Sequence, residues 1–103
     1  MTSPCAHLHV HSEYSILDGA CRIPALAEKA ARLEMPAVSL TDHGSLAGAV
    51  DLYRAARSQG VKPIVGCEVY VVDDRRKQHK GNAHLTLLAA DNDGYGNLIL
   101  ARA

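Results

Sequence analysis

Hydrophobic and polar positions alternate along this chain between the spacing of strands and the spacing of helices. Four segments have the alternating or continuous apolar pattern that is typical of strands, namely residues 6–11, 37–41, 63–72 and 84–90. Three segments place apolar residues at helical spacing, namely residues 23–34, 46–58 and 94–102. Strands and helices therefore follow one another in turn along most of the sequence.

Local signals predict where the helices begin and end. Pro36 stops the first helix, since proline cannot continue it. Ser45 is a suitable N-cap for the second helix, and Gly60 supplies its C-terminal stop. Asp93 is a suitable cap for the last helix. Polar segments with turn residues predict loops over 12–22 and 73–83.

Strands that alternate with helices of this length predict an α/β fold with parallel strand pairing and right-handed crossovers. Four strands and three helices are about half of a (β/α) barrel, for which about 250 residues is typical. Because a half barrel leaves open strand edges, we expect the 103 residues to be a fragment of a larger domain. An open α/β sheet, or pairing with a second copy, remains an alternative.

Composition narrows the functional classes only slightly. The chain has 48% hydrophobic residues and 11 basic against 11 acidic side chains, so net charge alone favours neither nucleic acid nor membrane. Three cysteines at 5, 21 and 67 form no Cys-x-x-Cys pair, which is typical of reduced thiols. No apolar run approaches the roughly 18 residues of a membrane span. With no visible signal peptide, we expect a cytoplasmic protein.

Histidine is the unusual component of this composition. His7, His9 and His11 lie at i, i+2 and i+4, which places them on one face of a strand. Two imidazoles at this spacing can grip one divalent ion, and histidine is the commonest metal ligand. The alternative is a half-exposed strand that happens to be rich in histidine.

Further donors follow the other predicted strands. Asp18 lies before Gly19, His43 follows the second strand, Glu68 interrupts an apolar strand, and His84 opens the fourth. Each has an ordinary alternative as a turn, cap or surface residue. Because ligands gather beyond the carboxyl ends of parallel strands, we expect a shared cleft that holds two or three divalent ions. Such clusters favour hydrolysis of a phosphoester.

Other chemistries find little support in the sequence. Gly-rich dinucleotide and P-loop motifs are missing, and so is a Gly-x-Ser-x-Gly elbow. The basic run at 75–80 could touch phosphates, although it is better explained as a solvated loop, and we leave its His79 out of the site.

Four segments resemble the PHP (polymerase and histidinol phosphatase) domain family, in the form that begins the α subunit of bacterial DNA polymerase III. The first two are His7-Leu8-His9-Val10-His11-Ser12-Glu13-Tyr14-Ser15, with Leu17-Asp18-Gly19-Ala20, and Leu40-Thr41-Asp42-His43-Gly44. The others are Lys62-Pro63-Ile64-Val65-Gly66-Cys67-Glu68-Val69-Tyr70-Val71 and His84-Leu85-Thr86-Leu87-Leu88-Ala89, with Gly94-Tyr95 and Asn97-Leu98. They stand in the family's order and cover nearly the whole chain.

The resemblance implies a distorted (β/α)7 barrel with up to three divalent metals, which could be Zn, Mn or Fe. By motif position it implies six ligands, namely His9, His11, Asp18, His43, Glu68 and His84. The family's remaining ligands, a cysteine or histidine and an Asp-x-His pair, come from later strands. We therefore expect residues 1–103 to be the N-terminal part of a PHP domain and to be inactive alone.

The resemblance also implies a role in DNA replication, with DNA and other replicase subunits as partners of a full-length DNA-directed DNA polymerase. That polymerase's nucleotidyl-transfer site lies far downstream, so the PHP part would act as a metal-dependent 3′–5′ exonuclease. Two alternatives remain open. One is a stand-alone phosphoesterase of the histidinol-phosphatase type, and the other is a non-catalytic, metal-stabilised structural module.

Overall fold

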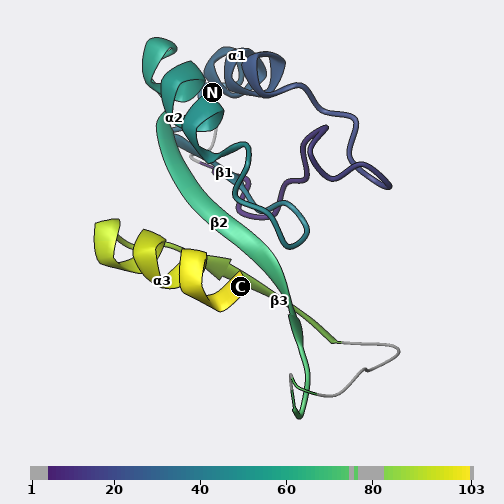
Figure 1. Ribbon diagram of the computed structural model, residues 1–103. Coiled ribbons are helices and arrows are strands. Elements are labelled where there is room, and N and C mark those ends of the chain that lie inside the picture. The colour runs from purple at the N-terminus through teal and green to yellow at the C-terminus, as the bar shows by residue number, and fades with distance from the viewer. Residues whose placement is uncertain (1–4, 75, 77–82, 103) are drawn as a thin grey trace.

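The computed structural model describes residues 5–74, 76 and 83–102 as a mixed α/β structure (Figure 1). Its elements follow in the order α1 (Ile23–Arg32), β1 (Ala37–Leu40), α2 (Ala49–Ser58), β2 (Lys62–Val71), β3 (Ala83–Leu88) and α3 (Asn92–Arg102). The predicted α/β class is confirmed. The predicted helices and the last three predicted strands are all present, with bounds that differ from the predicted ones by at most three residues.

The three strands form one sheet in the order β1-β2-β3. The first four residues of β2 pair with β1 in parallel, and the last six pair with β3 in the antiparallel direction. The prediction of parallel pairing throughout is therefore wrong for β3. Parallel strands need a crossover connection of about a dozen residues or more, usually a helix, whereas only the polar stretch 72–82 separates β2 from β3 in the sequence.

Residues 6–11 lie beside β1 but do not form a regular strand, contrary to the prediction. The backbone N–H groups of Ser39 and Thr41 donate to the carbonyls of His7 and Val10, at 3.0 and 2.8 Å. The ladder is interrupted because the Val10 N–H donates to the hydroxyl of Thr41 at 3.0 Å instead of to a carbonyl. The segment still follows the edge of β1 in the parallel direction.

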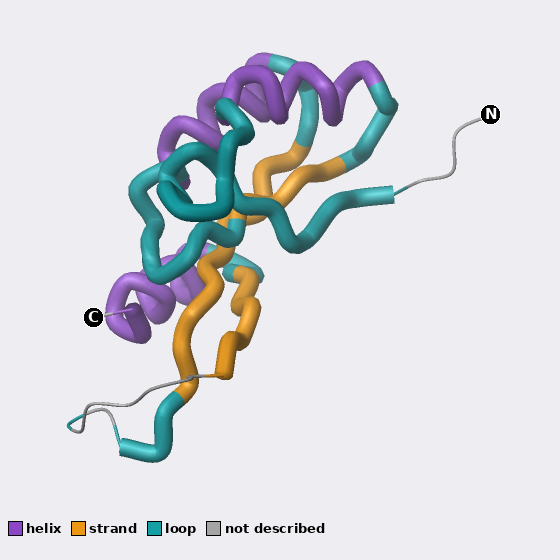
Figure 2. Tube along the Cα trace, turned by 90° about the vertical axis from the view of Figure 1, so that its right-hand side faces the viewer, coloured by secondary structure: helices purple, strands orange, loops and turns teal. Residues whose placement is uncertain are grey.

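The core lies between α1, α2 and one face of β1. Ile23 and Ala30 of α1 and Leu52 and Ala56 of α2 pack against alternate residues of the sheet and its approach, namely Val38, Leu40 and Val61. Two views show α1 and α2 at one end of the long β2, while α3 lies beside the middle of that strand (Figures 1 and 2). This packing leaves Ser39 and Thr41 on the opposite face of β1.

Two of the predicted helix caps are wrong. The second helix begins after Gly48, whereas Ser45 lies four residues before the helix starts at Ala49, and its hydroxyl accepts a hydrogen bond from the Ala47 N–H at 3.0 Å. The last helix is capped by Asp91, whose Oδ1 accepts from the Gly94 N–H at 2.9 Å, and not by Asp93. Gly60 does end α2, in the left-handed conformation with φ of 74°.

Within the described part of the chain, the helices are too short or too polar for any of them to cross a membrane.

Candidate metal centre

The six side chains that the sequence singled out lie together at one end of the sheet. Their donor atoms form three groups in which every atom lies within 4.8 Å of the others. The groups are His9–His11–Glu68, His11–Asp18–His43 and His43–Glu68–His84. His11, His43 and Glu68 each belong to two groups, so the three groups form one continuous cluster.

The donors reach the cluster from several parts of the fold. His9 and His11 lie on the extended segment beside β1, and Asp18 lies in the loop that follows it. His43 comes directly after β1 and forms an isolated parallel bridge with Glu68 of β2. The antiparallel direction of β3 brings its first residues, including His84, back to the same end of the sheet.

Glu68 is the centre of this cluster and is only 3% exposed. Its Oε1 lies 2.5 Å from His9 Nε2 and 3.4 Å from His11 Nε2. Its Oε2 lies 2.8 Å from His43 Nδ1 and 3.0 Å from His84 Nδ1. Burial raises the pKa of the Glu68 carboxyl, but the hydrogen bond with His9 and the nearby His43 and His11 outweigh this, so the pKa falls below its ordinary value.

Asp18 completes the cluster on its more exposed side. Its Oδ2 lies 2.8 Å from His43 Nε2 and 3.5 Å from His11 Nδ1. The hydrogen bond with His43 lowers the pKa of the Asp18 carboxyl below its ordinary value, against a smaller opposing effect of burial. The rings of His11 and His43 therefore each stand between two carboxylates, and their two nitrogens could serve two different ions.

The donor chemistry suits divalent metal ions as well as the hydrogen bonds that join several of these side chains. His43 Nδ1 is buried and close to Glu68 Oε2, yet these two atoms are not oriented for a hydrogen bond. Ligands that each lie roughly 2.0–2.1 Å from one ion stand about 3 Å apart, which is the separation seen here. A mixture of imidazole and carboxylate donors suits zinc, manganese or iron.

Two neighbours of the cluster were not proposed as site residues from the sequence. The Tyr70 ring stacks on His43 with centroids 6.3 Å apart and meets the edge of His84 at 4.8 Å. Its position two residues after Glu68 in a strand could have indicated a shared face. Asp42 is buried beside His43 and accepts hydrogen bonds from Ser12 and Ser15. No sequence signal distinguishes this contact from a ligand role.

Other residues considered in the sequence take no part in the described cluster. His7 pairs with β1 through its backbone and joins none of the three donor groups. Arg76 of the basic run pairs with Asp74 at 3.0 Å, while the rest of that run, including His79, lies outside the described residues. Cys5, Cys21 and Cys67 take part in no disulfide among the described residues.

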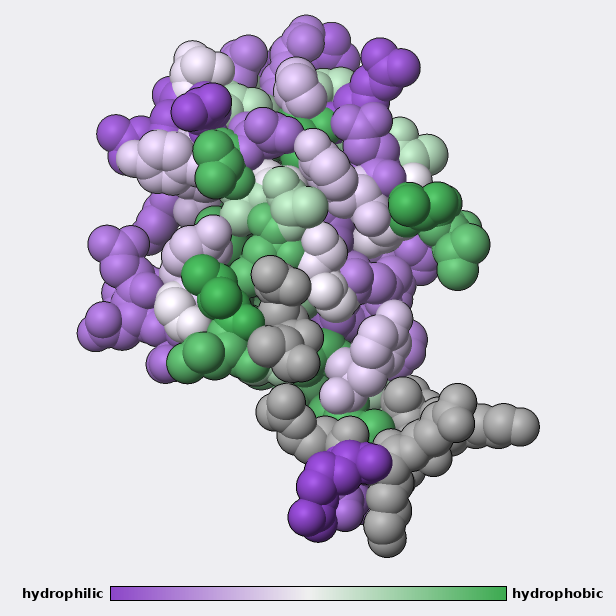
Figure 3. All heavy atoms as spheres, in the orientation of Figure 1, coloured by the Kyte–Doolittle hydropathy of each residue, from purple (hydrophilic) through white to green (hydrophobic). Residues whose placement is uncertain are grey.

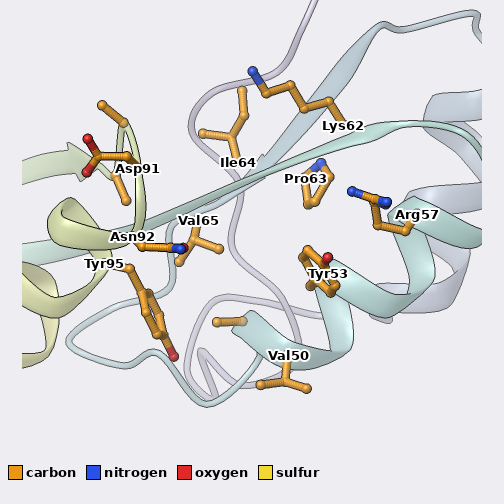
Figure 4. Close-up of a pocket in the computed structure, with 13 residues that line it drawn as sticks. Val50, Tyr53, Arg57, Lys62, Pro63, Ile64, Val65, Asp91, Asn92 and Tyr95 are labelled. Atoms are coloured by element: carbon orange, nitrogen blue, oxygen red, sulfur yellow. The ribbon is translucent and has the colours of Figure 1, made fainter.

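A separate groove of about 560 Å³ lies between α2, the first half of β2 and the start of α3 (Figure 4). Tyr53 and Arg57 approach it from α2, and Asn92 and Tyr95 approach it from α3. Apolar residues also reach the surface in this region of the molecule (Figure 3). None of the six candidate ligands lines the groove.

Comparison with known proteins places these observations in a family. DNA polymerase III subunit alpha of Chlamydia muridarum is 48% identical over an alignment 99 residues long, which covers 90% of this chain and 8% of that protein. The Thermus aquaticus subunit is 47% identical over 103 residues, again with 8% of its length covered. The chain thus spans less than a tenth of the curated relatives it matches.

Solved structures show the same fold. An amidohydrolase from Chromobacterium violaceum, with bound sulfate and no metal, superposes with a TM-score of 0.65 at 26% identity over 92% of this chain and 32% of that one. A protein assigned as a metal-dependent phosphoesterase from Bifidobacterium adolescentis gives a TM-score of 0.66 at 19% identity, over 97% of this chain and 34% of that one.

The family model of the PHP domain matches residues 7–101, which include all six candidate ligands. The architecture agrees with part of a PHP-type barrel. The two relatives described above are both named DNA polymerase III subunit alpha. The chain therefore belongs to the PHP domain family.

Proposed function

We propose that this chain is the N-terminal PHP-domain portion of a replicative polymerase of the DNA polymerase III alpha kind, and that its cluster binds divalent metals for phosphoester hydrolysis. The relatives at 46–48% identity, all with that polymerase name, support the first half. The single observation that carries the second half is the buried Glu68 carboxylate, with four imidazoles from three segments of the chain within 3.4 Å of it.

His9, His11, Asp18, His43, Glu68 and His84 would hold the metals, which we propose to be Zn, Mn or Fe, up to three in a complete domain. When bound, such ions polarise a phosphoryl oxygen and lower the pKa of a bound water, which supplies a nucleophile at neutral pH. The protein's own contribution is to fix the donors. The sheet carries Glu68 and His84, and Tyr70 packs against the rings of His43 and His84.

DNA is the substrate that the polymerase relatives favour, with removal of nucleotides from a 3′ end as the reaction. Other replicase subunits are the proposed partners. A stand-alone phosphoesterase of the histidinol-phosphatase type is less well supported, because the curated relatives at this identity bear the polymerase name. The second alternative is a non-catalytic, metal-stabilised module, which the experiments below distinguish from an active nuclease.

The metal half is tested on the 103-residue chain by titration with Co²⁺, followed by visible absorption. Glu68→Gln keeps the shape of the side chain but removes its charge, so we expect affinity to fall at least tenfold, as for other metal ligands. Glu28→Gln, at an exposed position of α1, is the matched control and should bind like the wild type. Equal binding by the wild type and Glu68→Gln would refute this metal site.

The hydrolytic half is tested on the longest product of the gene that contains these residues. We expect Mn²⁺-dependent release of nucleotides from the 3′ end of single-stranded DNA, lost in Glu68→Gln and kept in Glu28→Gln. Tight metal binding without any such release would identify a structural module. Release of phosphate from small phosphomonoesters, with no action on DNA, would favour the stand-alone phosphoesterase.

A further inference from the structure

Asp42 is a buried carboxylate that contacts no candidate metal donor through its side chain. It is 1% exposed, and both of its oxygens are occupied by hydrogen bonds from the loop 12–22. Oδ1 accepts from the Ser12 N–H at 2.6 Å and from the Ser15 hydroxyl at 2.8 Å, and Oδ2 accepts from the Ser12 hydroxyl at 2.7 Å. Three donors offset the cost of burying this charge.

These contacts fix the part of the loop that presents Asp18. The Ser15 carbonyl accepts from the Asp18 and Gly19 N–H groups at 3.1 and 2.7 Å, which forms a tight turn directly anchored to Asp42. A Cβ on Gly19 would lie 2.0 Å from the Ser12 carbonyl oxygen, so the turn packs closely upon itself. The position of Asp18 thus depends on a short chain of contacts that ends at Asp42.

The backbone of Asp42 and its neighbour extends the connection to the other donors. The Asp42 carbonyl accepts from the Glu68 N–H at 3.0 Å. The His43 N–H donates to the Ser15 hydroxyl at 3.1 Å, and that hydroxyl in turn donates to Asp42. The Asp42 residue therefore ties together the three segments that carry Asp18, His43 and Glu68.

We propose that Asp42 is a positioning residue of the metal centre, which sets the distance between Asp18 and the imidazoles of His11 and His43. This inference rests on the proposed metal binding. It predicts that Asp42 acts on one ion, the one that His11, Asp18 and His43 would share, and leaves the His43–Glu68–His84 group largely intact. A residue that served only the hydrophobic core would instead change stability without changing the binding of a particular ion.

The test compares Asp42→Asn, Ser15→Ala and Ser39→Ala by Co²⁺ titration of the 103-residue chain, with circular dichroism to establish folding. Asp42→Asn replaces one carboxylate oxygen, a hydrogen-bond acceptor, with an amide nitrogen, which is a donor. This nitrogen would face the hydroxyl or the N–H of Ser12, which are donors as well. Outer contacts of this kind are typically worth about 10–100-fold in metal affinity, so we expect one ion to bind at least tenfold more weakly. Ser15→Ala removes one hydrogen bond to Asp42 but keeps the charge of that carboxylate, so it should weaken the binding of the same ion by a smaller factor.

Ser39→Ala is the matched control, because this buried hydroxyl lies on β1 and has no hydrogen-bond partner in the described structure. It should bind like the wild type. The metal affinity of a double variant, Asp42→Asn with Asp18→Asn, distinguishes positioning from a purely structural role. Since Asp42 acts through Asp18, adding Asp42→Asn to Asp18→Asn should cost no further affinity.

The outcomes separate this inference from the proposed function. If the wild type binds Co²⁺ and both Asp42→Asn and Ser15→Ala bind it with the same affinity, the positioning role is overturned and the metal site stands. Equal weakening of every ion, or a further loss in the double variant, would also overturn it. A wild-type chain that binds no Co²⁺ would refute the metal site itself. If Asp42→Asn does not fold, Ser15→Ala decides.

Discussion

At the scale of single residues, the environment of Glu68 shows how a buried charge is retained in this sheet. An isolated carboxylate so deeply buried would normally take up a proton, because transfer from water disfavours its charged form. Here the effect of burial is opposed by His9, His43 and His11, and the pKa of Glu68 falls below its ordinary value of 4.5. The imidazoles thus hold the carboxylate in the ionised form that a metal requires.

The lowered pKa values of Glu68 and Asp18 predict how stability depends on pH in the metal-free chain. A group whose pKa is lower in the folded state stabilises it at pH values above its unfolded pKa, and this contribution is lost as pH falls through the folded pKa. The ordinary values are 4.5 for Glu68 and 3.8 for Asp18, so we expect the free energy of unfolding to fall as the pH drops below about 4.5.

Urea unfolding in EDTA at pH 7, 5, 4 and 3 measures this dependence. Glu68→Gln cannot titrate, so its profile should be flatter than the wild-type profile in the same range. Glu28→Gln, whose side chain is exposed, should follow the wild type. Parallel profiles for the wild type and Glu68→Gln would show that Glu68 has the same pKa in the folded and unfolded chains.

At the scale of elements, α1 and α2 end in the same way but with different residues. In α2 the Val61 N–H bonds to the Ala56 carbonyl and the Gly60 N–H bonds to the Arg57 carbonyl, which is a Schellman motif. α1 repeats this pattern with Glu34 in the left-handed position, at φ of 57°. Glycine adopts that conformation without the strain that other residues incur.

Gly60 and Gly96 should therefore respond in opposite ways to the same substitution. A Cβ at either position would meet no atom within 4 Å, so only the backbone decides. Gly60→Ala forces alanine to a φ of 74° and should lower the free energy of unfolding by about 1 kcal/mol. Gly96→Ala lies inside α3 and should raise it by about 0.5–1 kcal/mol. Urea unfolding at pH 7 measures both, and effects of equal sign would contradict this account.

The elements also show which features local sequence patterns can predict. Apolar periodicity located α1 and α2 because each buries one consistent face. Short, mostly apolar runs located β1, which is buried throughout, and β2, which is buried in its middle. The cap at Ser45 failed because α2 begins after Gly48 without a side-chain cap, and the cap at Asp93 failed because Asp91, two residues earlier, is an equally suitable capping residue. Residues 6–11 alternate like a strand, but a single side-chain contact from Thr41 interrupts their ladder.

The candidate site could be assembled from the sequence because its donors follow strands whose ends meet. The direction of β3 was predicted wrongly, yet His84 still joins the cluster, since an antiparallel strand begins where its neighbour ends. Contacts that depend on the folded loop could not be predicted. Asp42 turns toward Ser12, some 30 residues earlier in the chain, and no local pattern distinguishes that orientation from one toward a metal.

At the scale of the whole molecule, β2 joins two parts that otherwise share few contacts among the described elements. Its first residues pair with β1 beneath α1 and α2, while its later residues pair with β3 (Figures 1 and 2). The candidate ligands come from both parts. His9, His11, Asp18 and His43 belong to the first, and Glu68 and His84 belong to the β2–β3 pair. A bound ion would therefore link the two parts directly.

Metal binding should consequently stabilise the whole fold and not the site alone. A ligand that binds only the folded state adds RT ln(1 + [L]/Kd), which is about 2.7 kcal/mol at a hundredfold excess over Kd. We expect Mn²⁺ or Zn²⁺ to raise the melting temperature of the chain, and EDTA to reverse the shift. His9→Ala removes one contact of Glu68 and should reduce the shift.

His7→Ala is a demanding control for that experiment, because it removes the same kind of side chain from the same segment, two residues away. The backbone of His7 bridges to Val38, but its imidazole joins none of the three donor groups. The His7 variant should therefore keep the full metal-induced shift in melting temperature. If both histidine variants lost the shift equally, the ions would be acting on exposed imidazoles in general, and a cluster that links the two parts through Glu68 could not be the cause of the stabilisation.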